Sequence, residues 1–327
     1  MSKQRAFISG IAGQDGSYLA EFLLEKKYDV VGLVRSYESD CSRIVDLKDS
    51  IKIEYGNVLD TAHMLELMKK YEPTEIYHLA SKSFVPASWS EPLLTADVTA
   101  MGVTSMLEAF RVGVPKAKFF QASSSEMFGN VPQSPQNEGT PFLPQTPYGA
   151  SKVYGHFMTT NYRRHYNLHA CSGIMYNHES IRRDIRFVTR KITSAVAKIK
   201  LGLENVLKIG NTDVSRDWGF AGDYVEAMWL QLQSNTPTDY VIATGTIHTV
   251  KQLLELAFSS VGLEWSDFVI VDPKFCRAPE KNILVGDISK IKKELGWCPQ
   301  VSFEKLITEM VQFDLDSYEK LGKKSAA

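Results

Sequence analysis

Two side chains four residues apart, Tyr148 and Lys152, are the pair in this sequence most able to carry out proton chemistry. Residues at this spacing lie on one face of a helix, one turn apart. The lysine ammonium can there lower the pKa of the phenol and hold the ribose of a nicotinamide cofactor. Such a tyrosine can exchange a proton with a substrate hydroxyl while a hydride moves to or from the cofactor. The same spacing also arises by chance, as a partly buried tyrosine beside a solvated lysine.

A serine-rich segment, Ala122–Gly129, precedes this pair and supplies two further candidates, Ser124 and Glu126. It follows a short apolar run, Ala117–Gln121, that is typical of a strand. The hydroxyl of Ser124 can orient the substrate oxygen. The carboxylate of Glu126 can remove a proton from the carbon next to a ketone, which starts the loss of water from the adjacent carbon. The alternative for Glu126 is a carboxylate that only caps the end of the strand.

The third feature is a glycine-rich loop in which Gly10, Gly13 and Gly16 follow a GxxGxxG pattern. The loop joins a short apolar run, Ala6–Ser9, to a segment with apolar residues at helical spacing, Tyr18–Lys26. Glycines allow a tight turn and a close backbone approach, so a pyrophosphate can bind the amide groups at the N-terminus of the helix. The pattern therefore predicts a dinucleotide site, and a glycine-rich turn without a ligand is the alternative.

The residues after the second expected strand favour NADP as the dinucleotide. An acidic residue at this point would bind the 2′-hydroxyl of the ribose, whereas a cation would accommodate a 2′-phosphate. Here the run Val30–Val34 is followed by Arg35, and Arg43 comes soon after. A solvated surface arginine is the alternative role for Arg35.

Strands alternate with helices in the first half of the chain, as expected of βαβ units around a parallel sheet. We therefore predict an α/β fold: a doubly wound parallel-sheet Rossmann domain with a smaller, mixed α/β C-terminal substrate lobe over the carboxyl edge of the sheet. The expected division gives the Rossmann domain residues 1–176 and 218–245, and the lobe residues 177–217 and 246–327. The expected strands are Ala6–Ser9, Val30–Val34, Ile51–Tyr55, Glu75–Leu79, Ala117–Gln121 and Ala170–Tyr176. The expected helices are Tyr18–Lys26, His63–Lys70, Thr99–Val112, 148–164, Phe187–Leu201, Asp223–Gln233, Val250–Val261 and Ile288–Leu295.

The charge balance of the sequence limits how the protein can bind an anionic ligand. The sequence has 327 residues, with 37 Lys and Arg against 38 Asp and Glu, and a formal net charge of -1. This balance excludes bulk electrostatic attraction to nucleic acid or to an anionic membrane, so a few placed cations and amides must bind any ligand phosphate. No apolar run approaches the ~20 residues of a membrane-spanning helix, and the N-terminus lacks the apolar core of a signal peptide. The four cysteines form no CxxC pair, and we expect a cytoplasmic protein without a metal site.

Together these motifs resemble those of the GDP-mannose 4,6-dehydratase family, in the extended short-chain dehydrogenase/reductase superfamily. The resemblance covers nearly the whole chain. Other nucleotide-sugar epimerases share the glycine loop and the Tyr-Lys segment only in loose form. The most specific segments are GIAGQDGSYLAEFLLEK at Gly10–Lys26, QASSSEMFG at Gln121–Gly129, PYGASK at Pro147–Lys152, NHESIRRDIRFVTRKI at Asn177–Ile192, SRDWGFAGDYVEAMW at Ser215–Trp229 and VIATG at Val241–Gly245.

The resemblance implies an intramolecular redox cycle with NADP. Tyr148 would take the proton of the sugar 4-hydroxyl as a hydride leaves C4 for the cofactor. Glu126 would then remove the C5 proton, which the new ketone makes acidic, and water would leave from C6. Return of the hydride to C6 would give GDP-4-keto-6-deoxymannose and regenerate NADP.

The resemblance also implies roles for single residues. The catalytic residues would be Ser124, Glu126, Tyr148 and Lys152. The cofactor would contact Gly10, Gly13, Gln14, Asp15, Gly16, Arg35, Asn57, Val58, Leu79, Ala80, Ser81, Tyr148, Lys152, His178 and Arg183. The sugar nucleotide would contact Ser83, Asn177, Lys191, Arg216, Arg277 and Glu280. For Arg216 the alternative is an ion pair with Asp217 or another acid, and for Lys191 and Glu280 it is a solvated surface position.

Some positions depart from the family pattern and leave alternatives open. They are Ser124 for threonine, Asn57 for aspartate, Lys82 for glutamine, Ile181 for proline, and Ser36 where a second arginine follows the first. The alternatives are the same dehydration of a GDP-manno-heptose, the NADPH-dependent reduction of a GDP-4-keto-6-deoxy sugar, 4-epimerisation, and a relative that binds NADP without catalysis. The resemblance further implies a homodimer formed through the helices at 99–112 and 149–162, or a homotetramer.

Overall fold

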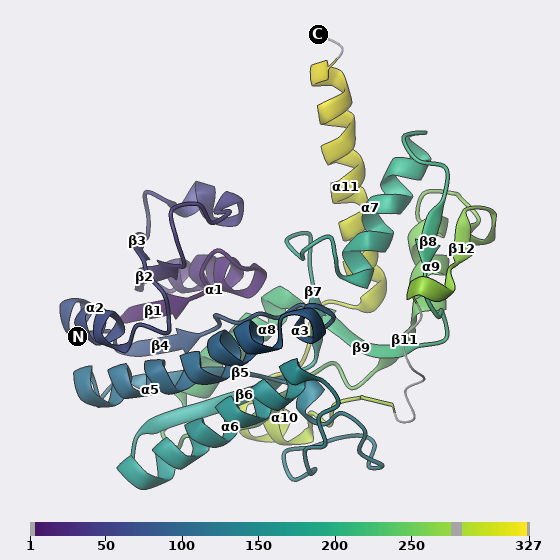
Figure 1. Ribbon diagram of the computed structural model, residues 1–327. Coiled ribbons are helices and arrows are strands. Elements are labelled where there is room, and N and C mark those ends of the chain that lie inside the picture. Colours follow the sequence, from purple (N-terminus) through teal and green to yellow (C-terminus); the bar gives the residue numbers. More distant parts are fainter. Residues whose placement is uncertain (1–3, 276–282, 326–327) are drawn as a thin grey trace.

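A computed structural model describes residues 4–275 and 283–325, with a parallel sheet of seven strands at its centre (Figure 1). In chain order its strands are β1 (Arg5–Ser9), β2 (Asp29–Val34), β3 (Lys52–Tyr55), β4 (Glu75–His78), β5 (Lys118–Ser124), β6 (His169–Met175) and β10 (Tyr240–Ile242). Their order across the sheet is β10-β6-β5-β4-β1-β2-β3, and neighbouring strands are parallel. The six predicted strands are confirmed. Their order, 3-2-1-4-5-6, is typical of a doubly wound dinucleotide-binding fold.

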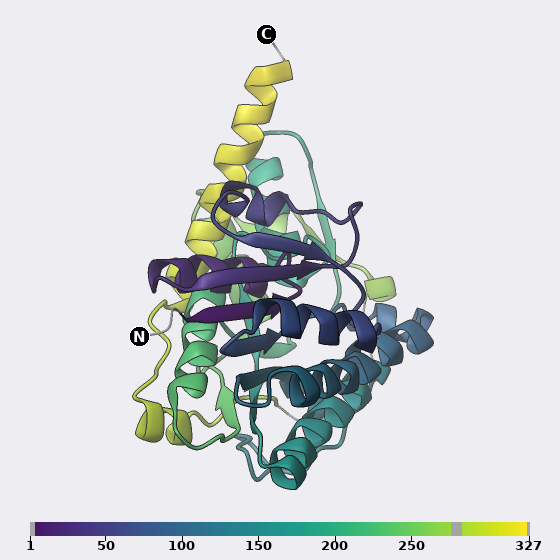
Figure 2. The same ribbon diagram turned by 90° about the vertical axis from the view of Figure 1, so that its left-hand side faces the viewer.

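Helices cover both faces of this sheet (Figures 1 and 2). One face carries α1 (Gln14–Glu25), α8 (Ala221–Gln233) and α10 (Ser289–Leu295), and the other carries α2 (Thr61–Tyr71), α5 (Gly102–Gly113) and α6 (Pro147–Tyr166). Adjacent residues of a strand point to opposite faces. Phe7 and Ile8 of β1 therefore lie in two different hydrophobic cores, and both are fully buried. The predicted fold class is confirmed by this arrangement.

The second part of the chain forms a smaller lobe of short strands and longer helices. Its strands are β7 (Asn177–Glu179), β9 (Ser215–Phe220) and β11 (Ile247–Thr249) in one sheet, and β8 (Leu207–Ile209) and β12 (Val269–Val271) in a separate pair. Its helices are α7 (Val188–Lys200), α9 (Val250–Ser259) and α11 (Phe303–Ser325). Ile192, Leu253 and Ile307, one from each helix, are buried in a common core. In Figure 1, α11 runs beside α7 toward the C-terminus.

Some elements go beyond the sequence-based prediction. The longest of them is α11, with 23 residues. Two short helices, α3 (Ala87–Ser90) and α4 (Pro92–Ala96), and a π-helical turn, Asp97–Met101, lead into α5. α10 packs against β10 of the large sheet, although residues 246–327 are expected in the smaller lobe.

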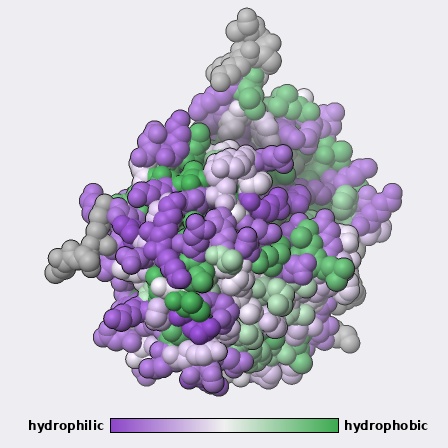
Figure 3. Space-filling view, turned by 60° about the vertical axis from the view of Figure 1, so that its left-hand side comes forward, coloured by the Kyte–Doolittle hydropathy of each residue, from purple (hydrophilic) through white to green (hydrophobic). Residues whose placement is uncertain are grey.

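The surface is mixed in character. On the face that Figure 3 presents, hydrophilic and hydrophobic residues are interspersed. Within residues 4–275 and 283–325, every helix is too short or too polar to cross a membrane. Three half-exposed hydrophobic side chains, Met101, Tyr154 and Phe157, lie at the start of α5 and on α6.

Candidate active site

A cavity of about 930 Å³ lies between the carboxyl ends of the sheet strands and the smaller lobe. Its wall combines the loop after β1, the ends of β2, β4 and β5, the start of α6, and residues of β7, α7 and β9. Because parallel strands share one carboxyl edge, segments far apart in the sequence meet here. The cavity therefore brings together most of the side chains selected from the sequence.

The glycine-rich loop requires glycine for steric reasons. Gly10 has a φ of 77°, and a Cβ there would lie 2.9 Å from the backbone nitrogen of Ala80. A Cβ at Gly16 would lie 2.4 Å from the carbonyl oxygen of Gly10. α1 begins directly after Gly13 without a side-chain cap. The first amide groups of α1 thus have no helical acceptor, and their residues line the cavity.

Ser124 and Glu126 lie where β5 ends. Ser124 is the last residue of the strand, and its hydroxyl accepts a hydrogen bond from the amide of Glu126 at 3.3 Å. Glu126 belongs to the 3₁₀ turn Ser125–Met127 that follows. Both residues line the cavity, so the strand end presents a hydroxyl and a carboxylate to the same space.

Tyr148 and Lys152 lie one turn apart at the start of α6, as the sequence predicts. Thr146 caps this helix by accepting a hydrogen bond from the amide of Gly149 at 3.0 Å. Both Tyr148 and Lys152 are buried and line the cavity. The Nζ atom of Lys152 donates to the carbonyl of Ala122 at 2.7 Å and lies 5.6 Å from the centre of the Tyr148 ring. The lysine is thereby fixed between the tyrosine and the backbone of β5.

Burial shifts the pKa of both groups. It raises the pKa of the Tyr148 phenol above its usual value; the hydroxyl of Ser124 counteracts this, and the charge of Glu126 adds to it. Burial lowers the pKa of Lys152 to about 8, against the opposing charge of Asp15. Lys152 therefore carries its charge at neutral pH. That this charge lowers the pKa of Tyr148 stays a prediction.

A buried polar group beneath Lys152 was not selected from the sequence. His78, the last residue of β4, has its Nδ1 atom 2.7 Å from the hydroxyl of Ser9. Burial, and to a smaller extent the charge of Lys152, lowers the pKa of His78 to about 3. The ring is thus neutral over the physiological pH range and adds no second charge beneath the lysine. Its place at the carboxyl end of a predicted strand is a signal that could have identified it.

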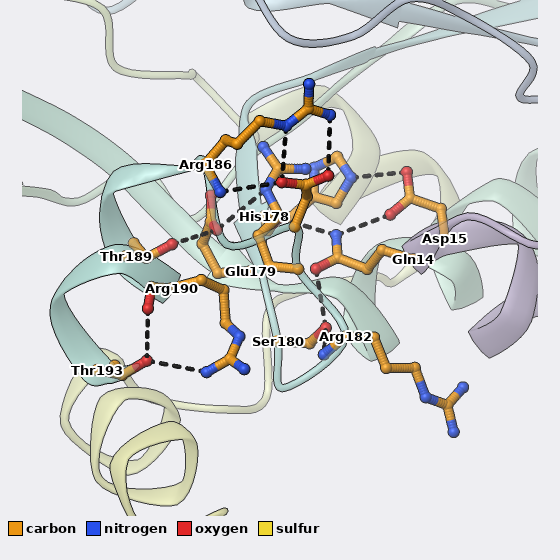
Figure 4. Close-up of polar contacts among 12 residues, drawn as sticks. Gln14, Asp15, His178, Glu179, Ser180, Arg182, Arg186, Thr189, Arg190 and Thr193 are labelled. Carbon is orange, nitrogen blue, oxygen red and sulfur yellow. Dashed lines mark hydrogen bonds and ion pairs between the residues drawn. The ribbon is translucent and has the colours of Figure 1, made fainter. Parts of the chain in front are cut away.

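The expected cofactor residues surround one end of the cavity. Those that line it are Gly10, Gly13, Gln14, Asp15, Gly16, Arg35, Asn57, Val58, Leu79, Ala80, Ser81, His178 and Arg183. Asp15 and His178 contact each other, with Oδ2 and Nε2 2.8 Å apart (Figure 4). Arg183 pairs with Glu179 at 3.2 Å and stacks on the ring of Phe187.

The expected substrate residues fall into two groups. Ser83, Asn177, Lys191 and Arg216 line the cavity, whereas Arg277 and Glu280 lie outside the described residues. The Nζ atom of Lys191 lies 4.1 Å from the centre of the Phe275 ring, and burial lowers its pKa. The carboxylate of Asp217 accepts hydrogen bonds from the amides of residues 244, 245 and 286. Asp217 is therefore committed to the loop after β10.

The segment 180–187 contributes cavity residues that the sequence did not single out. At one end Arg182 pairs with Glu21 of α1 at 2.6 Å. At the other end the rings of Phe187 and Phe84 meet edge to face with centroids 5.5 Å apart. Arg186 lies over Phe84. The segment thus contacts both sides of the cavity, and its run of arginines was the available signal.

Comparison with protein families and curated proteins gives consistent matches. The family model described as "GDP-mannose 4,6 dehydratase" matches residues 7–310. GDP-mannose 4,6 dehydratase 1 of Arabidopsis thaliana is 49% identical over 324 residues, which is 95% of this chain and 90% of the relative. GDP-mannose 4,6 dehydratase of Homo sapiens is 43% identical over 346 residues, which is 97% of this chain and 87% of the relative. The matched residues include both the large sheet and the smaller lobe.

Solved structures with the same fold have lower sequence identity. UDP-glucose 4-epimerase of Thermotoga maritima has a TM-score of 0.86 at 24% identity, covering 96% of this chain and 100% of that one. A dTDP-glucose 4,6-dehydratase of Bacillus anthracis in complex with NAD has a TM-score of 0.83 at 20% identity, covering 97% of each chain. RMD of Pseudomonas aeruginosa complexed with NADPH has a TM-score of 0.80 at 21% identity, covering 96% and 100%. At these identities the likeness shows the fold alone.

Proposed function

The chain belongs to the GDP-mannose 4,6-dehydratase family, and on this basis we propose that it converts GDP-mannose to GDP-4-keto-6-deoxymannose. It is a lyase that works with a nicotinamide cofactor. The observation that carries the proposal is that Glu126 lines the same cavity as Tyr148 and Lys152. 4-Epimerisation or ketone reduction needs hydride transfer and a proton shuttle on oxygen. Among these three reactions, elimination alone needs a base toward carbon.

The cavity suits a dinucleotide, and we propose NADP. The first turn of α1 offers amide groups, and Gly10 and Gly16 allow a phosphate to approach the backbone. Arg35 and Arg43 line the cavity beyond the end of β2, where a 2′-phosphate would meet them. When bound, NADP would supply the group that accepts a hydride from C4 and later gives it back at C6.

Tyr148 is the proposed base for the proton of the sugar 4-hydroxyl. The hydroxyl of Ser124 would orient the same sugar oxygen and stabilise the phenolate, since it lowers the pKa of the phenol. Burial opposes ionisation of Tyr148, so a nearby cation is required. Lys152 is the proposed source of that charge, and the carbonyl of Ala122 holds its ammonium in place.

Glu126 is the proposed base for the C5 proton. It follows Ser124 by two residues, so the strand end that orients the C4 oxygen also presents the carboxylate. The ketone at C4 would acidify C5, and Glu126 would take the C5 proton. We propose that the protonated Glu126 then passes this proton to the C6 hydroxyl, which leaves as water, so that one group serves as base and then as acid. When the hydride returns to C6, C5 would regain a proton from the protonated Tyr148.

The proposed sugar-nucleotide site uses a few placed cations. With a net charge of -1 the chain has no general attraction for a diphosphate. Lys191 and Arg216 line the cavity, and Arg277, outside the described residues, is proposed as a further contact. Arginine suits a diphosphate because its planar group donates two parallel hydrogen bonds. Asn177 and Ser83 are the proposed neutral contacts.

We also propose a domain division and a mode of assembly. We assign the cofactor domain residues 1–176 and 221–245 together with α10, because β9 ends at Phe220 within the smaller sheet and α10 packs against β10. The remaining residues, 177–220 and most of 246–327, would bind the sugar nucleotide. Exposed Met101 and Phe157 support a dimer formed through α5 and α6. The cytoplasm is the proposed compartment.

The proposed reaction is tested by incubating the protein with GDP-mannose and a trace of NADP, without added reductant. We expect the sugar nucleotide to lose the mass of one water. An unchanged mass with an altered sugar would indicate epimerisation instead, and turnover of a keto sugar only with stoichiometric NADPH would indicate a reductase. A parallel incubation with a GDP-manno-heptose measures the preference between the two sugars.

A further inference from the structure

A largely buried polar network at the wall of the cavity joins the N-terminus of α1 to β7 (Figure 4). Oδ2 of Asp15 lies 2.8 Å from Nε2 of His178. The side-chain Nε2 of Gln14 donates to Oδ1 of Asp15 at 3.0 Å and to the carbonyl oxygen of His178 at 3.1 Å. Ser180 completes the network by donating to Oε1 of Gln14 at 2.8 Å. Side chains therefore tie the glycine-rich loop to the first strand of the smaller lobe.

The contacts of His178 define its protonation state. Its Nδ1 atom lies 2.7 Å from the carbonyl oxygen of Tyr176, and its Nε2 atom faces the carboxylate of Asp15. A carbonyl and a carboxylate can only accept, so both ring nitrogens must carry a hydrogen and the ring is an imidazolium cation. Burial would lower the pKa of His178, but the charge and hydrogen bond of Asp15 outweigh it and raise the pKa. Burial likewise opposes ionisation of Asp15, yet its contacts with His178 lower its pKa to about 2.

The other groups around His178 do not replace Asp15 as its counter-charge. Arg183 is a cation that acts to lower the pKa of His178, and it pairs with Glu179. The ring of Tyr224, from α8, stacks on the imidazole with centroids 4.6 Å apart. Asp15 is therefore the anion directly bonded to this histidine.

The position of the pair matters for an anionic ligand. Asp15 lies in the first turn of α1, where the helix dipole and the free amides favour a phosphate. A carboxylate without a counter-charge at this point would repel that phosphate. Both nitrogens of His178 are already bonded, so its ring can neutralise Asp15 but offers no further donor to a ligand.

We propose that Asp15 and His178 form a clasp that holds the glycine-rich loop against β7 and cancels the negative charge of Asp15 beside the dinucleotide. His178 then acts through Asp15, as a positioning residue. The proposal rests on the proposed use of NADP. It predicts that replacing His178 changes the affinity for NADP by a different factor when Asp15 has also been replaced.

The clasp is tested with full-length variants and NADP⁺ as the probe, by calorimetry without sugar nucleotide. His178→Phe keeps a ring to stack on Tyr224 but leaves Asp15 uncompensated, so we expect the Kd to rise at least about tenfold. Adding Asp15→Asn removes that carboxylate and should recover part of the loss. If the double variant binds as weakly as His178→Phe or more weakly, the clasp is wrong. His165→Gln, which removes an exposed histidine of α6, is the control with unchanged affinity.

A second measurement on the wild-type protein avoids any folding defect of the variants. NMR of isotope-labelled protein without cofactor should find both ring nitrogens of His178 protonated at about pH 7, above the usual pKa of histidine. A neutral His178 ring at this pH would overturn the clasp. If wild-type protein with a protonated His178 did not bind NADP⁺, the proposed cofactor would be wrong and the effect of the clasp on its affinity would fall with it.

Discussion

The two sides of the cavity hold their functional side chains by different means. On the sheet side, Ser124 ends a seven-residue strand and Tyr148 lies in the first turn of a twenty-residue helix, so the backbone hydrogen bonds of these elements hold both. On the lobe side, β7 has three residues, and ion pairs position side chains of this strand and of the segment after it. These pairs include Asp15 with His178 and Arg183 with Glu179.

Substitutions on the sheet side should therefore change mainly the reaction rate, and substitutions on the lobe side mainly the stability of the protein. Truncating a reactive atom on the sheet side removes a chemical step but leaves the backbone contacts that place its neighbours. Breaking an ion pair on the lobe side leaves a buried charge without a partner, which destabilises the protein. Changes on the two sides should therefore give distinguishable results.

The largest expected effect comes from removing the phenolic hydroxyl of Tyr148. Tyr148→Phe should lower kcat by about 10³- to 10⁴-fold, because the sugar hydroxyl loses its base. The melting temperature should change little. Tyr154→Phe, at a half-exposed tyrosine of the same helix, is the matched control with wild-type activity. A large loss of stability in Tyr148→Phe would show that this residue also holds the fold.

The next effect separates oxidation from elimination. Glu126→Gln keeps the shape of the side chain but removes the base toward C5, so dehydration should slow by about 10²-fold or more. Oxidation at C4 should still occur, and the absorbance of the reduced nicotinamide should accumulate during a single turnover. Dehydration at the wild-type rate would rule out Glu126 as the carbon base.

On the lobe side, the buried pair of Arg190 and Asp314 should affect stability. Asp314→Asn leaves the charge of Arg190 buried between α7 and α11, so the free energy of unfolding should fall by about 3–5 kcal/mol. Asp316→Asn, at an exposed position of the same helix, should change it by no more than about 0.5 kcal/mol. Chemical denaturation measures both. Equal values for the two variants would contradict the proposed difference between the sides.

The smallest effect is a pH dependence on the sheet side. Burial lowers the pKa of Lys152 to about 8, so its ammonium is lost as the pH rises through that value. We expect kcat to fall above about pH 8, by up to tenfold per pH unit. The free energy of unfolding should increase as the pH rises from the pKa of Lys152 in the folded protein to its higher pKa in the unfolded chain. Over this range the unfolded state binds more protons at Lys152 than the folded state does. A rate that stays constant up to pH 10 would contradict this role of Lys152.

The sequence predicts the sheet side well because its signals are local. The spacing of Tyr148 and Lys152 lies within one helix, and each predicted strand is a short segment in which apolar residues are adjacent or alternate with polar ones. The same kind of signal was present for α11, where Leu306, Ile307 and Met310 recur at helical spacing and are buried. That helix could therefore be predicted from the sequence.

The lobe side could not be predicted in the same way. β7 and β11 have three residues each, too few for an alternating pattern to be recognised. Asp15 and His178 are 163 residues apart in the sequence, and no periodicity links them. The resemblance placed each of them near the cofactor. Only the fold indicates that they contact each other.

The most direct test of the proposed reaction follows one hydrogen atom. GDP-mannose carrying deuterium at C4 is incubated with the protein and unlabelled NADP, and the product is examined by mass spectrometry and NMR. If one site oxidises C4, eliminates water and returns the same hydride, the deuterium should appear at C6 of the 4-keto-6-deoxy sugar. Loss of the deuterium to solvent or to the NADP pool, or its retention at C4, would contradict the account.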